Sequence, residues 1–310
     1  MAKLLVGPTM NIDNGVANAL VIMQRHYGAR AIQLLLGAPD STTVKTIEQS
    51  DAERALKIKS RYGFYLVVHG KYRYNFCRPA STAGWGWQFS SLDRELTEAA
   101  KIGADVVIHQ GKNLPELGQS REVAHQTYAD NIMAVLKRPA VAALSNRLLL
   151  ENSSRQGTEC GWNLEDLADI YGRIPAELRG RIGFCIDLCH AFVAGVADFR
   201  EATGAASFFQ EFEERIGADK LLLVHFNDSA TPYDGHNDHH ACLECGYIAG
   251  AALGGDTAGM RYVARYCAER GIPMILETGG PYAKEVRRVA EDYAGYKMCR
   301  ENGEVKYLQA

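Results

Sequence analysis

Histidine and acidic residues recur at one end of successive apolar segments of this sequence. Six short segments, rich in branched apolar residues, end in such a residue or run directly into one, and three more follow close behind two of these segments. The nine residues are His69, His109, Glu151, Asp187, His190, His225, Asp238, His240 and Glu277. A carboxylate or imidazole is costly in an apolar interior unless it is paired or bound to a metal ion. Because six of them stand at the same end of successive segments, we expect one convergent site.

The types and number of these residues indicate a site for several metal ions. Histidine and carboxylate ligands without cysteine suit zinc, with manganese or iron as alternatives. Nine groups are too many for one ion and suit two or three. Asp187 and His190 stand three residues apart, so a tight turn or a first helical turn would present both to neighbouring ions. Asp238 and His240 stand two apart in a polar segment, and an extended chain would point both the same way.

The segments that carry these residues have the pattern of alternating strands and helices. Strands are expected at 4–7, 32–36, 65–69, 106–109, 148–152, 184–187, 221–227 and 274–278. Helices are expected between them at 15–27, 51–62, 92–103, 123–137, 164–171, 208–217 and 258–270. Continuous apolar strands suit a parallel sheet that is buried on both faces. The alternation predicts an α/β fold, a single (β/α)8 TIM barrel with its site at the C-terminal ends of the strands, and we expect residues 1–310 to form one catalytic domain.

Composition restricts the class of protein further. With 310 residues, 47% of them hydrophobic and 23% charged, the chain can form an ordinary globular protein with a sizeable core. No apolar run approaches the roughly 18–20 residues that cross a bilayer, and the N-terminus lacks the apolar region of a signal peptide. We therefore expect a cytoplasmic protein without a membrane partner. The net charge of −3 disfavours nucleic acid as a ligand, but three divalent ions at one face would reverse its sign.

Motifs around the nine residues resemble those of the endonuclease IV family of apurinic/apyrimidinic (AP) endonucleases. They are His69-Gly-Lys-Tyr72, His109-Gln-Gly111, Glu151-Asn-Ser-Ser-Arg-Gln-Gly-Thr158, Cys185-Ile-Asp-Leu-Cys-His-Ala-Phe192, His225-Phe-Asn-Asp-Ser229, Asp238-His-His240 and Leu276-Glu-Thr278. The motifs follow the family's order, and all nine of its metal-ligand positions carry the expected residue type. The resemblance implies a TIM barrel that binds three zinc ions and acts on damaged DNA.

The resemblance also implies how the ligands and the reaction are arranged. The three zinc ions would be held by His69, His109 and Glu151, by Glu151, Asp187, His225 and Glu277, and by His190, Asp238 and His240. The implied enzyme is a zinc-dependent phosphodiester hydrolase of base excision repair, with Glu151 and Glu277 as catalytic residues. A hydroxide that bridges two ions would attack the phosphate 5′ to an abasic site, leaving a 3′-hydroxyl and a 5′-deoxyribose phosphate. The implied partner is double-stranded DNA with abasic or 3′-blocked lesions, bound by a monomer.

Cationic and aromatic residues beside the predicted ligands are candidates for DNA contacts. They are Lys71, Tyr72, Arg73 and Asn75 after the third strand, Lys112 and Arg155 after the fourth and fifth, and His239 between two ligands. Cations hold phosphates, and aromatic rings stack on bases or wedge into the duplex. Tyr72 and Asn75 match positions that the family uses near the flipped-out sugar. The alternative is that the aromatic residues pack the top of the barrel and the cations remain solvated.

The chain departs from the family's pattern at the predicted DNA-binding face. Segment 37–42, after the second strand, lacks the arginine that penetrates the DNA in the family, which leaves open how the duplex is opened and bent. We hypothesise that the aromatic loop after the third strand compensates. His239 stands where the family usually has arginine, and Glu244 replaces a glycine and adds negative charge near the site. Cys242 and Cys245 have the spacing of a metal or redox pair, but a separate zinc site would lack its other ligands.

A sugar isomerase or epimerase on the same type of barrel is the main alternative. Four of the nine residues alone would make the single-metal site typical of those enzymes: Glu151, Asp187, His225 and Glu277. Such an enzyme has no use for the other five together, and a lysine base at a strand end is missing. A protein that binds lesions without cutting them is a further alternative, which the presence of every ligand disfavours. The sequence therefore favours the endonuclease.

Overall fold

Eight parallel strands close into a barrel. The computed structural model describes residues 4–301 and 304–309. The barrel strands are β1 (Val6–Asn11), β2 (Ala31–Leu35), β3 (Tyr65–His69), β4 (Asp105–His109), β5 (Leu148–Glu151), β6 (Ile182–Asp187), β7 (Leu221–His225) and β10 (Met274–Leu276). They are hydrogen-bonded in the order β1-β10-β7-β6-β5-β4-β3-β2, and β2 closes the barrel by pairing with β1. The predicted TIM barrel is confirmed.

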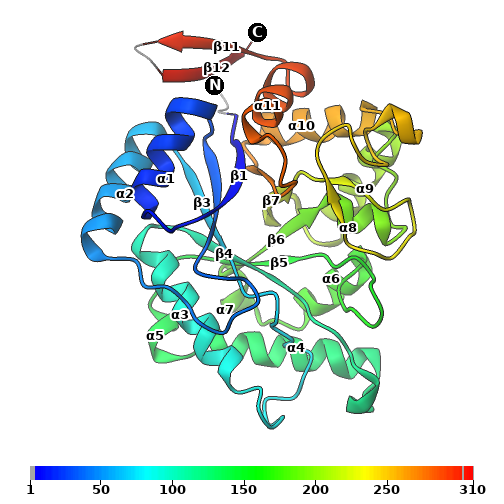
Figure 1. Cartoon of the computed structure of the whole chain (residues 1–310). Helices are drawn as coiled ribbons and strands as arrows, with labels where there is room; N and C mark the ends of the chain where they lie inside the picture. The colour runs from blue at the N-terminus through cyan, green and yellow to red at the C-terminus, as the bar shows by residue number, and fades with distance from the viewer. Residues whose placement is uncertain (1–3, 302–303, 310) are drawn as a thin grey trace.

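Helices surround the barrel and connect its strands (Figure 1). The longer helical segments are α1 (Val16–Ile22) with its π-helical continuation η1 (Met23–Tyr27), α2 (Gln49–Tyr62), α3 (Trp87–Lys101), α4 (Arg121–Leu136), α6 (Leu164–Gly172), α9 (Ala202–Arg215), α10 (Ala258–Arg270) and α11 (Tyr282–Arg288) with η5 (Val289–Tyr293). The short helices are α5 (Pro139–Ala142), α7 (Ala176–Arg179), α8 (Leu188–Val193), η2 (Pro115–Leu117), η3 (Ala218–Lys220) and η4 (Ala251–Leu253). A helix therefore lies at each of the seven expected helical positions. Within the described ranges, none of the helices combines the length and the apolar character that crossing a membrane requires.

Local sequence signals explain where several helices begin and end. The Ser120 hydroxyl accepts a hydrogen bond from the Val123 amide at the start of α4, and the Asn163 side chain accepts one from the Asp166 amide at the start of α6. These bonds satisfy amides that have no partner within the helix. Gly271 ends α10 in the left-handed conformation, with φ of 67°, which glycine adopts at little cost.

Two C-terminal elements have no counterpart among the expected segments. They are α11 with η5 and a hairpin of β11 (Tyr296–Glu301) and β12 (Glu304–Gln309). The hairpin packs beside η1, at the same edge of the molecule as the N-terminal helices (Figure 1). Gly28, with φ of 65°, has no Cβ, and the Val305 side chain occupies the space that a Cβ at this position would take. Most hairpin side chains are partly or fully exposed, which explains why the hairpin lacks a strong apolar pattern.

A small apolar layer lies inside the barrel beneath the predicted site. It consists of Ala31, Val67, Val107, Leu149, Cys185, Leu223 and Ile275. Side chains of a strand alternate between its two faces, so the residue two positions further along points the same way. Those residues are Gln33, His69, His109, Glu151, Asp187, His225 and Glu277. The strand geometry therefore places six predicted metal ligands, together with Gln33, in the layer above.

Candidate metal centre

The first group of donor atoms lies between β3, β4 and β5. Glu151 is completely buried, and its Oε2 lies 3.5 Å from His69 Nε2 and 3.7 Å from His109 Nδ1. One donor atom from each of these three residues lies within 4.8 Å of the others. This spacing is compact enough for all three atoms to contact one ion.

The second group lies on the other side of the same carboxylate. His225 Nδ1 is 2.8 Å from Glu151 Oε1, 3.1 Å from Glu277 Oε2 and 3.7 Å from Asp187 Oδ2. The four donor atoms again lie within 4.8 Å of one another. Glu151 therefore turns one oxygen towards each of the first two groups, which is the arrangement that a bridging ligand requires.

The third group joins α8 to the segment before β9 (His240–Ala241). His190 Nε2 lies 3.0 Å from Asp238 Oδ2, and His240 Nε2 lies 3.3 Å from Asp238 Oδ1. Asp187 ends β6 and begins α8, where its Oδ1 accepts a hydrogen bond of 2.9 Å from the His190 amide. This cap fixes the turn that presents Asp187 and His190 to neighbouring groups. The nine predicted ligands supply three candidate groups of the predicted membership, and two further groupings of some of the same residues include Cys185 or Cys189.

Hydrogen bonds on the far side of the imidazole rings orient two of the histidines. His69 Nδ1 lies 2.7 Å from the Gly70 carbonyl oxygen, and His190 Nδ1 lies 2.8 Å from that of Asn152. A carbonyl oxygen only accepts, so Nδ1 carries the hydrogen in both rings. Nε2 of each ring is then directed at its donor group, as in histidines that bind metal ions.

Three amide side chains that the sequence reasoning missed hold the acidic ligands, one through the main chain and two through the carboxylates. Asn152 Oδ1 accepts from the Asp187 amide at 2.7 Å, and Asn227 Nδ2 donates to Asp187 Oδ2 at 2.7 Å and to Glu277 Oε2 at 3.2 Å. Gln33 Nε2 donates to Glu277 Oε1 at 2.6 Å. Gln33 is the one polar residue within the apolar strand β2, and this is the signal that would have revealed it.

Unpaired donor atoms indicate that the residues fit metal ions. Glu151 Oε2, His190 Nε2 and Asp238 Oδ1 are buried and make no hydrogen bond of favourable geometry, although His69, Asp238 and His240 place opposite charges 3.5, 3.0 and 3.3 Å away. A buried polar atom without a partner costs about 1–3 kcal/mol, and coordination of an ion would remove that cost. The donors are imidazole and carboxylate, which suit zinc, with manganese or iron as alternatives.

Charge also favours cations in these groups. Burial opposes ionisation of the Glu151 carboxyl, but the imidazoles of His109 and His225 outweigh it and hold the pKa of Glu151 well below its ordinary value. Burial likewise opposes charge on His190, but Asp187 and Asp238 raise the pKa of His190 well above its ordinary value. Burial lowers the pKa of His109, so the excess of positive charge lies on other imidazoles, among them His190 and His225, whose pKa values are raised. An ion that binds there would take the place of their protons.

The three groups open into a cavity of about 570 Å³. His69, Glu151, His190 and Glu277 form part of its lining, so a ligand in the cavity would reach all three groups. Other parts of its wall come from the loops that follow β3, β4 and β5. They include Tyr72, Arg73, Asn75, Arg78, Trp85, Lys112, Leu114 and Glu159.

Tyr72 and Arg73 are exposed at this cavity, as their predicted role requires. The Tyr72 side chain is 47% exposed, and its ring centre lies 5.0 Å from that of His69 and 5.9 Å from that of His109. Arg73 is exposed, lines the cavity and has no ion-pair partner among the described residues.

Lys71 and Asn75 are placed differently from the expectation. The Lys71 side chain is buried, and its Nζ donates to the carbonyl oxygens of Leu36 and Ala38 at 3.1 and 3.0 Å. Lys71 therefore supports the loop after β2 instead of facing DNA. The Asn75 side chain lines the cavity, but its Nδ2 donates to the Lys112 carbonyl oxygen and its Oδ1 accepts from the Lys112 and Cys77 amides. Asn75 thus ties the loops after β3 and β4 together.

The remaining predicted DNA contacts lie at the rim. Lys112 Nζ pairs with Glu159 at 3.4 Å, and Arg155 stacks over the Trp162 ring at 4.4 Å and pairs with Asp234 at 3.4 Å. Neither of these two cations is unpaired. His239 is exposed between the ligands Asp238 and His240.

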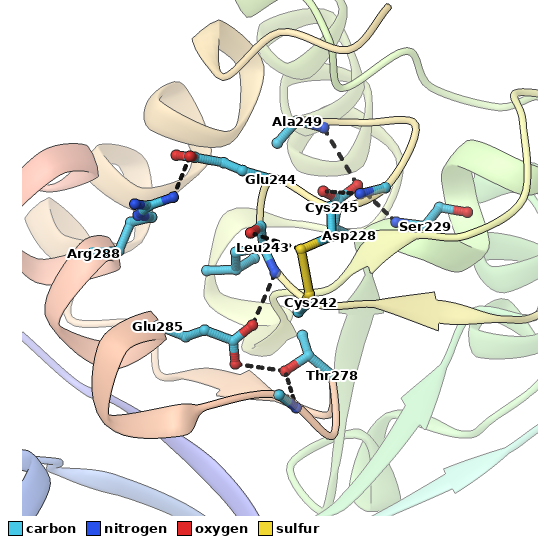
Figure 2. The surroundings of a disulfide bond; sticks show 12 residues. Asp228, Ser229, Cys242, Leu243, Glu244, Cys245, Ala249, Thr278, Glu285 and Arg288 are labelled. Atoms are coloured by element: carbon cyan, nitrogen blue, oxygen red, sulfur yellow. Dashed lines mark hydrogen bonds and ion pairs between the residues drawn. A yellow bond between two sulfur atoms is a disulfide. The ribbon is translucent and has the colours of Figure 1, made fainter. Parts of the chain in front are cut away.

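Cys242 and Cys245 form a disulfide in the turn that follows His240 (Figure 2). This pairing excludes the metal pair that their spacing also allowed. The turn lies between two anchors: Asp228 accepts hydrogen bonds from the Gly246, Ile248 and Ala249 amides, and Glu285 accepts from the Leu243 amide and the Thr278 hydroxyl. Thr278 follows Glu277, so the anchor joins the two loops that carry ligands from β7 and β10.

Glu244 does not bring a free negative charge to the site. Its carboxylate pairs with Arg288 (Figure 2). It also accepts a hydrogen bond from the Tyr293 hydroxyl at 2.8 Å. Glu244 has φ of 65°, in the left-handed region that glycine adopts at little cost. This backbone conformation explains why the family's pattern has glycine at this position, and the ion pair with Arg288 helps to hold the glutamate there.

Comparison with known proteins agrees with this geometry. Residues 24–253 match the family described as Xylose isomerase-like TIM barrel. A putative endonuclease 4 of Acanthamoeba polyphaga mimivirus is 30% identical over 276 residues, which cover 88% of this chain and 85% of that protein. The crystal structure of endonuclease IV from Thermus thermophilus matches with a TM-score of 0.75 and 25% identity, over 93% of this chain and 97% of that one. A D-tagatose 3-epimerase-like protein, with a TM-score of 0.63 and 14% identity over 93% and 96% of the two chains, shares the fold. The chain belongs to the endonuclease IV family.

Proposed function

We propose that this protein is a zinc-dependent AP endonuclease of base excision repair. It hydrolyses the phosphodiester on the 5′ side of an abasic site in double-stranded DNA and leaves a 3′-hydroxyl and a 5′-deoxyribose phosphate. The observation that carries the proposal is the meeting of three donor groups around Glu151, with unpaired donor atoms, at an open cavity. The relatives named endonuclease 4 and endonuclease IV support the same activity.

Each donor group would hold one ion. Zinc ions bound there lower the pKa of water from about 16 towards 7 and offset negative charge on phosphoryl oxygens. Manganese or iron in one or more of the groups suits the same donors. Glu151 contributes one oxygen to each of two groups and thereby fixes their separation.

Glu277 is the carboxylate that orients the attacking water. It is the only partly exposed member of the second group, while Glu151, Asp187 and His225 are completely buried. Asn227 and Gln33 hold its two oxygens, so the carboxylate has one orientation at the wall of the cavity. A carboxylate fixed in this way accepts a hydrogen bond from the water molecule and thereby directs the lone pair of the water oxygen at the phosphorus.

The loop after β3 provides the main contacts to DNA. Tyr72 presents an exposed ring above His69 and His109, where it can stack on the sugar or base beside the scissile phosphate. Arg73, which has no ion-pair partner in the described part of the chain, supplies a cation for a DNA phosphate. Lys112, Arg155 and His239 contact phosphates further along the rim. The chain acts as a monomer on abasic and 3′-blocked lesions.

The test is incision of a duplex that carries one tetrahydrofuran abasic analogue. That analogue cannot undergo β-elimination, so a cut on its 5′ side reports hydrolysis. We expect one incision that leaves a 3′-hydroxyl, is lost after chelation and returns with zinc. Protein with bound zinc that leaves the duplex intact would refute the proposal.

A sugar epimerase is the second candidate, because a D-tagatose 3-epimerase-like protein shares the fold. Such an enzyme would use Glu151, Asp187, His225 and Glu277 alone. It would not explain why His190, Asp238 and His240 form a further group. Incubation of the zinc-loaded protein with ketohexoses, followed by chromatography, tests this reading, and we expect no epimerisation.

A further inference from the structure

Gln33 lies in the same inward-facing layer of the barrel as the six metal ligands at the strand ends. It stands two residues after Ala31, in the middle of β2, and its side chain is completely buried. The other residues of β2 are apolar. A buried carboxamide without partners costs free energy, so its presence in this strand calls for an explanation through its contacts.

The Gln33 side chain crosses the barrel to two ligands of the second donor group. Its Nε2 donates to Glu277 Oε1 at 2.6 Å, and its Oε1 lies 2.8 Å from His225 Nε2. A further bond of 3.1 Å runs from Nε2 to the Thr9 hydroxyl on β1. β2 is not a neighbour of β7 or β10 in the barrel, because β1 separates it from β10. These bonds therefore span the interior.

The partners fix which way the carboxamide faces. A carboxylate only accepts hydrogen bonds, so the amide nitrogen must face Glu277 and the amide oxygen must face His225. Both hydrogens of Nε2 have acceptors, and the oxygen has a donor. The reverse orientation would place the amide oxygen against the Glu277 carboxylate.

This orientation determines which atoms of the two ligands remain for a metal ion. The Gln33 oxygen accepts, so His225 Nε2 carries a hydrogen. Nδ1, which donates to Glu151 at 2.8 Å and faces Glu277 and Asp187, is then the nitrogen whose proton an ion would replace. Oε1 of Glu277 is taken by Gln33, which leaves Oε2 facing His225 Nδ1 at 3.1 Å. Outer partners of this kind set the tautomer and direction of metal ligands.

We propose that Gln33 is a positioning residue for the second metal site, which holds His225 and Glu277 in their coordinating orientations from across the barrel. The inference rests on the proposed function only in that the second donor group binds zinc. Glutamine alone among the coded residues offers a donor and an acceptor at this reach. Glutamate would place an acceptor against Glu277, and methionine keeps the volume but offers neither bond.

The test measures zinc binding by the full-length protein without DNA. The variants are Gln33→Met and Gln33→Glu, with Gln24→Met as the matched control, because Gln24 is also a buried glutamine but lies in η1 with an Nε2 that has no hydrogen bond. Zinc per chain is measured at buffered free zinc, and cobalt substitution reports the coordination by its visible absorption. Circular dichroism establishes that each variant folds.

We expect one of three ions to bind about 10- to 100-fold more weakly in Gln33→Met, the usual effect of losing an outer partner. Gln33→Glu weakens the same ion, the cobalt spectrum changes, and Gln24→Met keeps wild-type binding. On the tetrahydrofuran duplex, kcat falls in both Gln33 variants while KM stays unchanged. Folded Gln33 variants that bind three ions with wild-type affinity and spectrum would overturn the proposal, as would an equal loss in Gln24→Met. Wild-type protein that binds zinc but does not incise DNA would refute the proposed function and leave this inference standing.

Discussion

Replacement of Glu151 by glutamine tests the central feature of the site. The substitution keeps the size of the side chain but removes its negative charge. Glu151 is completely buried, and its carboxylate lies 2.8 Å from His225, 3.5 Å from His69 and 3.7 Å from His109. Removing one partner of a buried, charged arrangement costs about 3–5 kcal/mol. Because each 1.4 kcal/mol is a factor of ten, zinc binding by the first two groups should weaken by about 10²–10⁴-fold.

The third group should be spared. His190 Nδ1 lies 3.6 Å from Glu151, but this nitrogen bonds the Asn152 carbonyl oxygen, and Nε2 is the atom that faces Asp238. We therefore expect Glu151→Gln to retain about one tightly bound ion per chain and to lose nearly all incision of the tetrahydrofuran duplex. The fold should persist, because without ions the surrounding imidazoles can release their protons.

The matched control is Glu98→Gln. Glu98 is also a buried carboxylate, but it lies on α3 and bonds Lys101 and the Ile47 amide at 2.7 Å each. This control should keep three ions and wild-type incision even if it loses stability. Metal content is measured by elemental analysis after dialysis, and folding by circular dichroism. Incision at the wild-type rate by folded Glu151→Gln would refute the reasoning that one carboxylate joins two ions.

Three further perturbations have defined outcomes. Tyr72→Ala should lower kcat/KM on abasic DNA about 10- to 100-fold through loss of about 1–3 kcal/mol of stacking, with zinc content unchanged; an unaltered kcat/KM would remove Tyr72 from the DNA interface. Burial raises the pKa of Glu95 to about 7, so the folded state keeps a proton that the unfolded chain releases above its ordinary pKa of about 4.3. The free energy of unfolding should therefore fall by about 3 kcal/mol between pH 4.5 and 7 from this group, and urea titrations of Glu95→Gln should lack that component. The double variant Cys242→Ser, Cys245→Ser should lose about 2 kcal/mol of stability in the same assay, since the disulfide closes a loop of only a few residues, and should still bind three ions because Asp228 holds the turn.

The ligands could be predicted from the sequence because strand geometry determines their direction. His69, His109 and Glu151 each end a buried strand, and alternation along a strand leaves only two directions for a side chain. One of these directions points into the barrel, so residue type and position together sufficed. The same reasoning applied to Gln33 would have placed it in the ligand layer, but an uncharged amide gives a weaker signal than an imidazole or a carboxylate.

The loop residues were harder to predict because a loop sets no periodic direction. Lys71 is a lysine close to a ligand, and its type alone indicates a solvent-exposed cation. Its burial depends on the carbonyl groups of Leu36 and Ala38, which a distant segment brings to it. The C-terminal hairpin was hard to predict for a similar reason, because its packing depends on the space above Gly28, which lies far away at the other end of the chain.

The strands therefore determine most of the metal-site geometry of this protein, and the loops determine its contacts with DNA. The first two donor groups are held by strand ends and by buried amides, so changes in the loops after β2 and β3 leave their geometry intact, whereas the third group takes Asp238 and His240 from the segment after β7. The loop after β2 lacks the expected arginine and is supported from below by Lys71, while the loop after β3 exposes Tyr72 and Arg73. Differences from other members of the family should thus appear mainly in DNA affinity and its salt dependence. The rate of hydrolysis from the bound state should depend on the residue types and geometry of the donor layer, including Gln33.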